Sequence, residues 1–222
     1  MSSRDTVLRA IRGALADVPR SVAPDGLPEP RLPAVDHVGA DVVGLFTERA
    51  ADYRATVVRV PQAQASAAVA EALRRTGARS LVVPPGCPED LVPEGPWTRL
   101  SDVPPLTVRQ LDDADAVVTG VTVAVAVTGT VILDGSSGQG RRALTLLPDQ
   151  HICVVRASQI VGDVPAALAR LDPLRPLVLV SGPSATSDIE LDRVEGVHGP
   201  RVLDVVVIDD SPLPCPTDTS HL

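Results

Sequence analysis

The sequence predicts an α/β fold, with one domain organised around a parallel sheet. Hydrophobic residues make up 44% of the 222 residues but aromatic residues only 1%, so the core has to be packed from Val, Leu, Ile and Ala. Runs of valine favour β-strands. A strand, a helix and a second strand follow one another with short links over residues 56–83. This order is typical of a βαβ unit, whose two strands run parallel.

Three parts are expected along the chain. Residues 1–37 are predicted to form an amphipathic helix followed by a linker with five prolines, which resists both helix and sheet. Residues 38–208 are predicted to form the α/β domain, and residues 209–222 a flexible tail rich in Pro and Ser. The apolar face of the first helix would consist of Val7, Leu8, Ile11 and Leu15.

Within the domain, the expected elements rest on local patterns. The helix near residues 63–76 has apolar residues at helical spacing, and Gly77 stands where a C-terminal cap belongs. Further helices are expected near residues 38–52 and 164–171. Strands are expected over residues 56–60, 80–83, 116–133, 151–155, 177–180 and 202–208.

The segment 116–133 is apolar on both faces, which is typical of a strand at the buried centre of a sheet. Gly120 and Gly129 interrupt it, and glycine within a strand marks a bend, a bulge or a close backbone approach. Nine branched residues are expected in or beside the central sheet: Val123, Val125, Val131, Ile132, Val154, Val178, Val180, Val205 and Val207.

Composition also excludes several functions. A formal net charge of −8 argues against nucleic acid or an anionic membrane as partner. The chain has no Lys, which excludes Schiff-base chemistry and the P-loop lysine. Cys87, Cys153 and Cys215 are too far apart for a zinc or Fe–S motif, so no metal and no cofactor is expected. Without a signal peptide or membrane span, the protein is expected to be cytoplasmic.

Two loops carry candidate binding residues. The segment 181–190 follows a strand and offers Ser184 and other hydroxyls to a carboxylate or phosphate, or it forms an ordinary turn and helix cap. The loop 134–142 ends in Arg141 and Arg142, which suit a planar anion, or it is a mobile hairpin end with surface arginines. Its G-x-G lacks the third glycine of a dinucleotide site.

His198 lies between glycines and a proline and could act as an acid or base. His151 begins an apolar strand and is expected to be hydrogen-bonded in place. We therefore expect four residues to converge on one anion-binding cleft: Arg141, Arg142, Ser184 and His198. Secondary candidates are Thr128, Thr130, Asp188 and Glu190. No catalytic residue follows from these motifs, because a G-x-S-x-G elbow is absent.

Several of these motifs occur in an order that resembles one protein family. They are Thr119-Gly120-Val121, Thr128-Gly129-Thr130, Gly138-Gln139-Gly140-Arg141-Arg142, Leu147-Pro148, His151-Ile152, Gly182-Pro183-Ser184, Asp188-Ile189-Glu190 and Gly196-Val197-His198-Gly199-Pro200. Over roughly residues 100–210 the set resembles the lactate-utilisation protein C family, or LUD domain. The resemblance implies a central, mainly parallel sheet with helices on both faces, similar to the sugar-phosphate isomerase and CoA-transferase group.

The resemblance also implies a function. It implies a role in oxidising L-lactate to pyruvate beside Fe–S or cysteine-rich partner proteins. Because the chain lacks a nucleophile elbow, Lys and a metal-cluster motif, we expect it to be an accessory or assembly component of that system. Family members commonly have an acidic residue just before T-G-T, where this chain has Val127. If that acid transfers protons, the chain lacks it or has moved the task to Asp188 or Glu190. The alternatives are an independent enzyme acting on a small acid, acyl-CoA or sugar phosphate, and a ligand-binding regulator.

Overall fold

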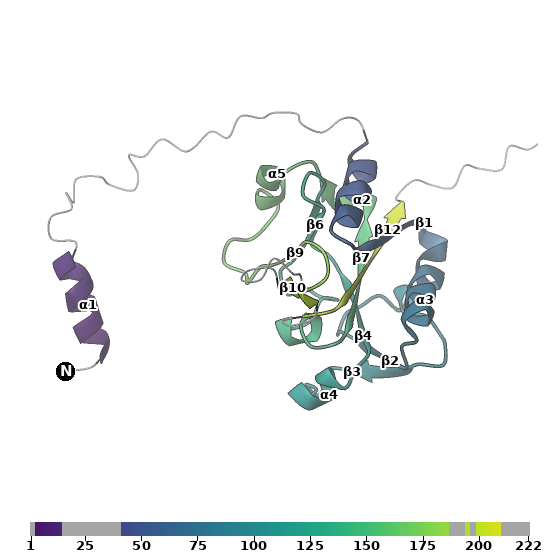
Figure 1. Ribbon diagram of the computed structural model, residues 1–222, viewed down its shortest axis with the longest axis horizontal. Helices are drawn as coiled ribbons and strands as arrows, with labels where there is room; N and C mark the ends of the chain where they lie inside the picture. Colours follow the sequence, from purple (N-terminus) through teal and green to yellow (C-terminus); the bar gives the residue numbers. More distant parts are fainter. Residues whose placement is uncertain (1–2, 15–40, 187–193, 196–198, 210–222) are drawn as a thin grey trace, which may run out of the picture. The chain divides into compact units, whose positions relative to one another are not determined.

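The computed structural model describes residues 3–14, 41–186, 194–195 and 199–209 (Figure 1). The chain divides into two units, residues 1–35 and 36–222, which are considered separately. In the first, α1 (Ser3–Ala14) is an amphipathic helix on which Val7 and Ile11 are exposed. The predicted division into helix and linker, domain and tail stays a prediction.

The second unit is built on a six-stranded parallel sheet (Figure 1). Its strands, in spatial order, are β1 (Thr56–Pro61), β12 (Val202–Asp209), β7 (Gln150–Arg156), β4 (Ala116–Gly120), β2 (Ser80–Val83) and β3 (Thr98–Ser101). The middle strands are valine-rich and almost wholly buried. Helices pack on the sheet, so the predicted α/β fold with a mainly parallel central sheet is confirmed. The likeness to the sugar-phosphate isomerase and CoA-transferase group stays a prediction.

Each face of this sheet is covered differently. On one face lies α3 (Ala65–Thr76), which ends at Gly77 with φ +72° in the left-handed conformation expected of a cap. The other face packs against α2 (Val42–Asp52) and against a second sheet. Beside β2 and β4, the short α4 (Val108–Asp112) covers the apolar surface through Leu111. Together these layers bury both faces of β7, β12 and β4.

The second sheet has four strands. In order they are β8 (Ile160–Val161), β5 (Val123–Val125), β6 (Thr130–Leu133) and β9 (Val178–Val180), and α5 (Val164–Leu168) packs on the face turned away from the first sheet. β5 and β6 run antiparallel, as do β6 and β9. A small antiparallel pair, β10 (Ala185–Thr186) and β11 (Val194–Glu195), follows β9. The 3₁₀ turns are η2 (Gln62–Gln64), η3 (Glu89–Leu91), η4 (Arg142–Thr145) and η5 (Ala157–Gln159).

The prediction of one central strand over residues 116–133 is wrong. The segment forms β4 in the first sheet and then β5 and β6 in the second. It is apolar on both faces because both sheets are covered on both sides. Gly129 has φ +58°, and a Cβ there would lie 2.4 Å from the backbone nitrogen of Ala50, so a turn and a close approach both require glycine. Of the nine branched residues, Val154, Val205 and Val207 are in the first sheet and the others in the second.

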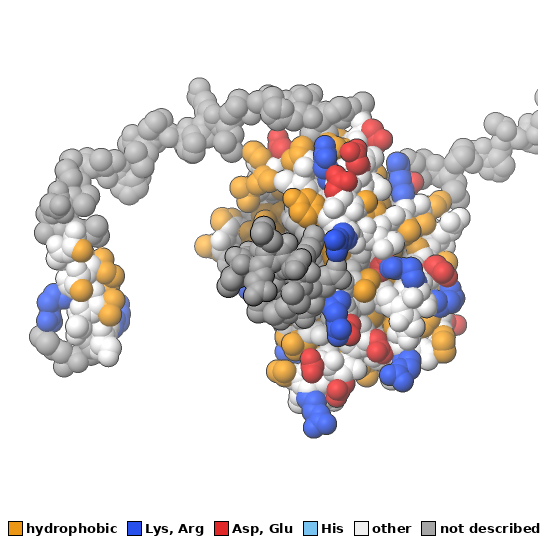
Figure 2. Space-filling view, viewed as in Figure 1, with side chains coloured by type: hydrophobic (Ala, Val, Ile, Leu, Met, Phe, Trp, Pro, Cys, Tyr) orange, Lys and Arg blue, Asp and Glu red, His pale blue; other side chains and the backbone are white. Residues whose placement is uncertain are grey.

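The surface gives two further observations. On the face seen in Figure 2, acidic and basic side chains are interspersed. Among the described residues, no helix has both the length and the apolar character needed to cross a membrane.

Candidate functional site

A cavity of about 230 Å³ lies between the first sheet and the segment that follows β9. Its polar side chains come from three parts of the chain: Arg142 and Thr145 in η4, His151 in β7, and Ser181 and Ser184 after β9. The backbone N–H of Ser184 donates to the carbonyl of Pro200 at 2.8 Å. This bond ties the segment after β9 to the segment that leads into β12.

A larger cavity of about 510 Å³ adjoins the first, since Arg142, Thr145 and Val178 line both. Charged groups on its wall are Asp134, Arg141, Arg142 and Arg175; its apolar wall is Leu133, Pro176, Leu177 and Val178. The side chain of Arg142 therefore borders both cavities.

The loop 134–142 is held by hydrogen bonds over the carboxyl ends of β4 and β2. The side-chain oxygen of Gln139 accepts from the backbone N–H groups of Asp134 and Gly135, at 2.8 and 3.0 Å. The N–H of Gly138 donates to the carbonyl of Pro85, and its own carbonyl accepts from Gly120. These bonds favour the interpretation of the loop as a shaped wall over that of a mobile hairpin end.

Asp134 is the anionic group of this loop. Its carboxylate accepts hydrogen bonds from the hydroxyls of Ser136 and Thr122 and from Arg175. Burial raises its pKa, but these hydrogen bonds outweigh burial and lower the pKa to about 2. Asp134 is therefore a carboxylate at neutral pH, and it forms an ion pair with the guanidinium of Arg175.

The two adjacent arginines have different roles. Arg141 makes two hydrogen bonds to the carboxylate of Asp102, at 2.9 and 3.0 Å, and a third to the carbonyl of Leu106. The hydrogen bond from Arg141 lowers the pKa of Asp102, which is 7% exposed. The side chain of Arg142 makes no hydrogen bond or ion pair with any residue that the structure describes. Arg142 is thus the arginine on the lining of these cavities that has no partner among the described residues.

His151 lies on the same face of β7 as the buried Cys153 and is 1% exposed. Its Nε2 is 2.8 Å from the hydroxyl oxygen of Thr119, and the sulfur of Cys153 is 3.3 Å from the same nitrogen. Burial lowers the pKa of His151 to about 4, so the ring is neutral at pH 7. His151 is held in place by hydrogen bonds, as the sequence predicted, but it also lines the small cavity, which sequence reasoning missed.

The predicted site residues are thus distributed as follows. Arg142 and Ser184 line the small cavity, and Arg141 lines the larger one. His198, Asp188 and Glu190 lie outside the described residues. Convergence of the four residues on one anion-binding cleft stays a prediction.

Thr128 and Thr130 line a third cavity, of about 310 Å³, on the α5 side of the second sheet. The Thr130 hydroxyl is 2.7 Å from the hydroxyl oxygens of Thr128 and Ser181, and Ser181 lines both this cavity and the small one. A chain of three hydroxyls therefore connects the two spaces.

Val127 packs against the apolar cluster under α5, and its N–H donates to the carbonyl of Gly162 at 3.1 Å. An uncharged side chain suits this surrounding. Within the described ranges, no group of three or more His, Cys, Asp and Glu side chains is placed to hold a metal ion. Chemically, the small cavity offers one cationic donor, two serine hydroxyls, a threonine hydroxyl and a neutral imidazole, a set that suits a small carboxylate or phosphate.

Comparison with known proteins gives consistent matches. A family model described as the LUD domain matches residues 106–208. A Deinococcus radiodurans protein named lactate utilization protein C is 46% identical, over 91% of this chain and 92% of the relative. Proteins of the same name from Shouchella clausii and Bacillus subtilis are 33% and 30% identical over about half of each chain.

A solved structure is also similar. The crystal structure of a DUF162 family protein from Deinococcus radiodurans superposes with a TM-score of 0.65 at 43% sequence identity. The match covers 76% of this chain and 97% of the crystallised one. Both kinds of comparison extend well beyond the matched motifs, and the chain therefore belongs to the lactate utilization protein C family.

Proposed function

We propose that the chain takes part in L-lactate utilisation as an accessory or assembly component of a system that oxidises lactate to pyruvate. The observation that carries this proposal is the 46% identity to a lactate utilization protein C over nearly the whole of both chains. Oxidising a hydroxy acid releases two electrons, which need an acceptor. The sequence carries no cluster motif and no dinucleotide fingerprint, so we propose that Fe–S or cysteine-rich partner proteins accept them.

The same proposal assigns the small cavity to an anionic ligand. Arg142 borders it without a described partner, and the Ser181 and Ser184 hydroxyls lie on the same lining. Arg141 supports the site indirectly, because its bonds to Asp102 fix the loop that carries Arg142. A carboxylate on Arg142 would gain charge-assisted hydrogen bonds, each contributing about 1.5 to 3 kcal/mol.

Calorimetric titration with L-lactate, pyruvate and inorganic phosphate tests the ligand. Arg142→Ala should weaken binding of the preferred anion by at least about tenfold, which corresponds to one such bond. Arg109→Ala is the matched control, since Arg109 is an exposed arginine on α4 away from the cavities. Equal affinities in the wild type and Arg142→Ala would refute the site.

The role in the cell needs a separate experiment. We expect the purified chain alone to reduce no dye with L-lactate, the mixture with its Fe–S partners to do so, and a deletion strain to lose growth on L-lactate. Turnover by the isolated chain would favour an independent enzyme. Normal growth of the deletion strain on L-lactate would refute the metabolic role.

The size of the adjoining cavity favours one alternative. At about 510 Å³, with an apolar wall and the shared Arg142, it has room for a ligand larger than lactate. An independent enzyme acting on an acyl-CoA or a sugar phosphate would use this space, and a ligand-binding regulator would use it without turnover. Titration with a sugar phosphate and with CoA distinguishes these ligands from small acids.

A further inference from the structure

The strand β1 forms one edge of the six-stranded sheet. In the part of the chain that the structure describes, β1 pairs with β12 on one side and with no strand on the other. Five of its six residues are Thr, Val or Pro, and Val58 is 40% exposed. Proteins usually protect such edges with short strands or charged side chains, because unpaired N–H and C=O groups attract another strand.

The opposite edge of the same sheet follows that rule. There β3 is four residues long, and three of its four residues are exposed and polar. Arg99 stands in the middle of it and donates to the carbonyls of Val92 and Pro93. β1 also carries an arginine, Arg59, which is paired with Asp209, and it ends in a proline. The two edges therefore differ in length and in apolar character: β1 has six residues with three valines, whereas β3 has four residues and is mainly polar.

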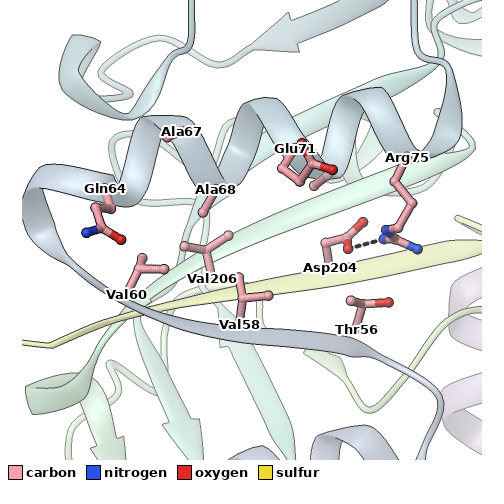
Figure 3. Close-up of a pocket in the computed structure, with 11 residues that line it drawn as sticks. Thr56, Val58, Val60, Gln64, Ala67, Ala68, Glu71, Arg75, Asp204 and Val206 are labelled. Atoms are coloured by element: carbon pink, nitrogen blue, oxygen red, sulfur yellow. Dashed lines mark hydrogen bonds and ion pairs between the residues drawn. The ribbon is translucent and has the colours of Figure 1, made fainter.

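An apolar groove continues the exposed edge onto the α3 face of the sheet. It has a volume of about 460 Å³, and Figure 3 shows Val58, Val60 and Val206 on one side of it and Ala68 of α3 on the other. Small alanines on α3 leave this space open. Its charged end is closed by the ion pair of Arg75 and Asp204 (Figure 3). An open apolar surface beside an unpaired strand is a feature of interaction sites.

We propose that β1 is the dimer interface of this protein and pairs antiparallel with β1 of a second copy, so that the two six-stranded sheets become continuous. A two-fold axis perpendicular to the sheet places directly opposite residues on the same face. The groove-side residues Thr56, Val58 and Val60 of one copy then face the same set in the other.

The sequence of β1 selects one register. With the axis at Val58, Thr56 lies opposite Val60, Val57 lies opposite Arg59, and Pro61 stays outside the paired residues. An axis at Arg59 would place two arginines opposite each other, which is destabilising, and would pair Pro61, which has no N–H to donate. An axis at Val57 would pair fewer residues of the strand. In the favoured register Arg59 keeps its ion pair with Asp209, so no unpaired charge enters the interface.

Sedimentation of the 222-residue chain over a micromolar concentration series tests the interface. We expect a monomer–dimer equilibrium, and Val58→Lys should raise the dimer dissociation constant by at least about tenfold, because it places two like charges at the axis. Thr98→Lys on β3 is the matched control and should leave the equilibrium unchanged. A wild type that is monomeric throughout, or an unchanged equilibrium in Val58→Lys, would overturn the proposal. Circular dichroism confirms that both variants are folded.

A cross-linking experiment tests the register independently of the affinity. In a Cys215→Ser background, Val58→Cys should form a disulfide-linked dimer under mild oxidation, because position 58 faces itself. Thr56→Cys should not, because its two copies would be separated by about 14 Å along the paired strands. Linkage at position 56 or at neither position would exclude this register.

Discussion

Gln150 and His151 are neighbours in β7, both nearly inaccessible, and they face opposite sides of the sheet. On the α3 side, Gln150 donates to Asp204 at 2.7 Å and to the carbonyl of Ala72, and it accepts from Thr76. On the other side, His151 bonds Thr119 and borders a cavity. The side-chain amide of Gln150 is fully hydrogen-bonded inside the protein, whereas His151 is hydrogen-bonded and also borders a cavity.

The difference shows how buried polar residues can be sorted. A group whose donors and acceptors are all used inside the protein stabilises the fold, and it has nothing left for a ligand. A hydrogen-bonded group that also borders a cavity can stabilise the fold and contact a ligand. The same criterion separates Arg141, which is bound to Asp102 and Leu106, from Arg142. The following variants test this distinction.

The largest effect is expected for Gln150→Ala. It leaves the buried carboxylate of Asp204 without this partner, so the free energy of unfolding should fall by about 2 to 4 kcal/mol. Urea denaturation measures the change. Gln62→Ala, at a half-buried glutamine whose hydrogen bonds with Asp90 and Arg156 are exposed, should cost less than about 0.5 kcal/mol. A loss that small at Gln150 would show that the network is not required for stability.

His151 should make stability depend on pH. Its pKa is lowered from 6.5 to about 4 in the folded protein, so the unfolded chain binds the proton more readily between these values. The contribution of neutral His151 to stability is therefore fully present above about pH 6.5. The free energy of unfolding should decrease on the order of 3 kcal/mol as the pH falls to 4. In His151→Gln this slope should be largely absent.

The difference between wild type and variant is the quantity to follow in that titration. It cancels the contribution of Asp204, whose pKa burial raises, because Asp204 is present in both proteins. Parallel stability curves for the two proteins between pH 4 and 6.5 would show that His151 is protonated equally in the folded and unfolded states.

Arg141→Ala and Arg142→Ala sharpen the comparison between the two arginines. Arg141→Ala should reduce the free energy of unfolding at pH 7 by about 1 to 2 kcal/mol. This is the contribution of a charged hydrogen bond, reduced because the side chain of Arg141 is partly exposed to solvent. Arg142→Ala should change it by less than about 0.5 kcal/mol. Arg141 lowers the pKa of Asp102 in the folded protein. The stabilising contribution of this ion pair is therefore present above the pKa of Asp102 in the unfolded chain, and it is lost as acid protonates Asp102. Equal destabilisation by both variants, by urea denaturation, would remove the distinction.

Much of the fold follows from local patterns, and the partners of the site residues do not. Helix α3 with Gly77 and the strands β1, β2, β7 and β12 are encoded by spacing within short windows. Arg141 and Arg142 cannot be told apart in this way, because the carboxylate that binds Arg141 is 39 residues away in sequence. The second sheet was not predicted for a related reason. An apolar run indicates that a strand is buried, but it does not indicate which sheet the strand belongs to.

The smallest effect concerns the hydroxyl chain that links the two cavities. Thr130→Val removes the hydroxyl that contacts both Thr128 and Ser181, so stability should fall by about 1 kcal/mol. Ser181 keeps its place on the small cavity, and Arg142 is untouched, so anion affinity should fall by less than about threefold. Thr128→Val is the matched control, since it removes one end of the chain and leaves the contact between Thr130 and Ser181. Calorimetric titration of both variants measures the anion affinity. A tenfold loss of affinity in Thr130→Val but not in Thr128→Val would show that Thr130 belongs to the anion site, because its hydrogen bond positions Ser181.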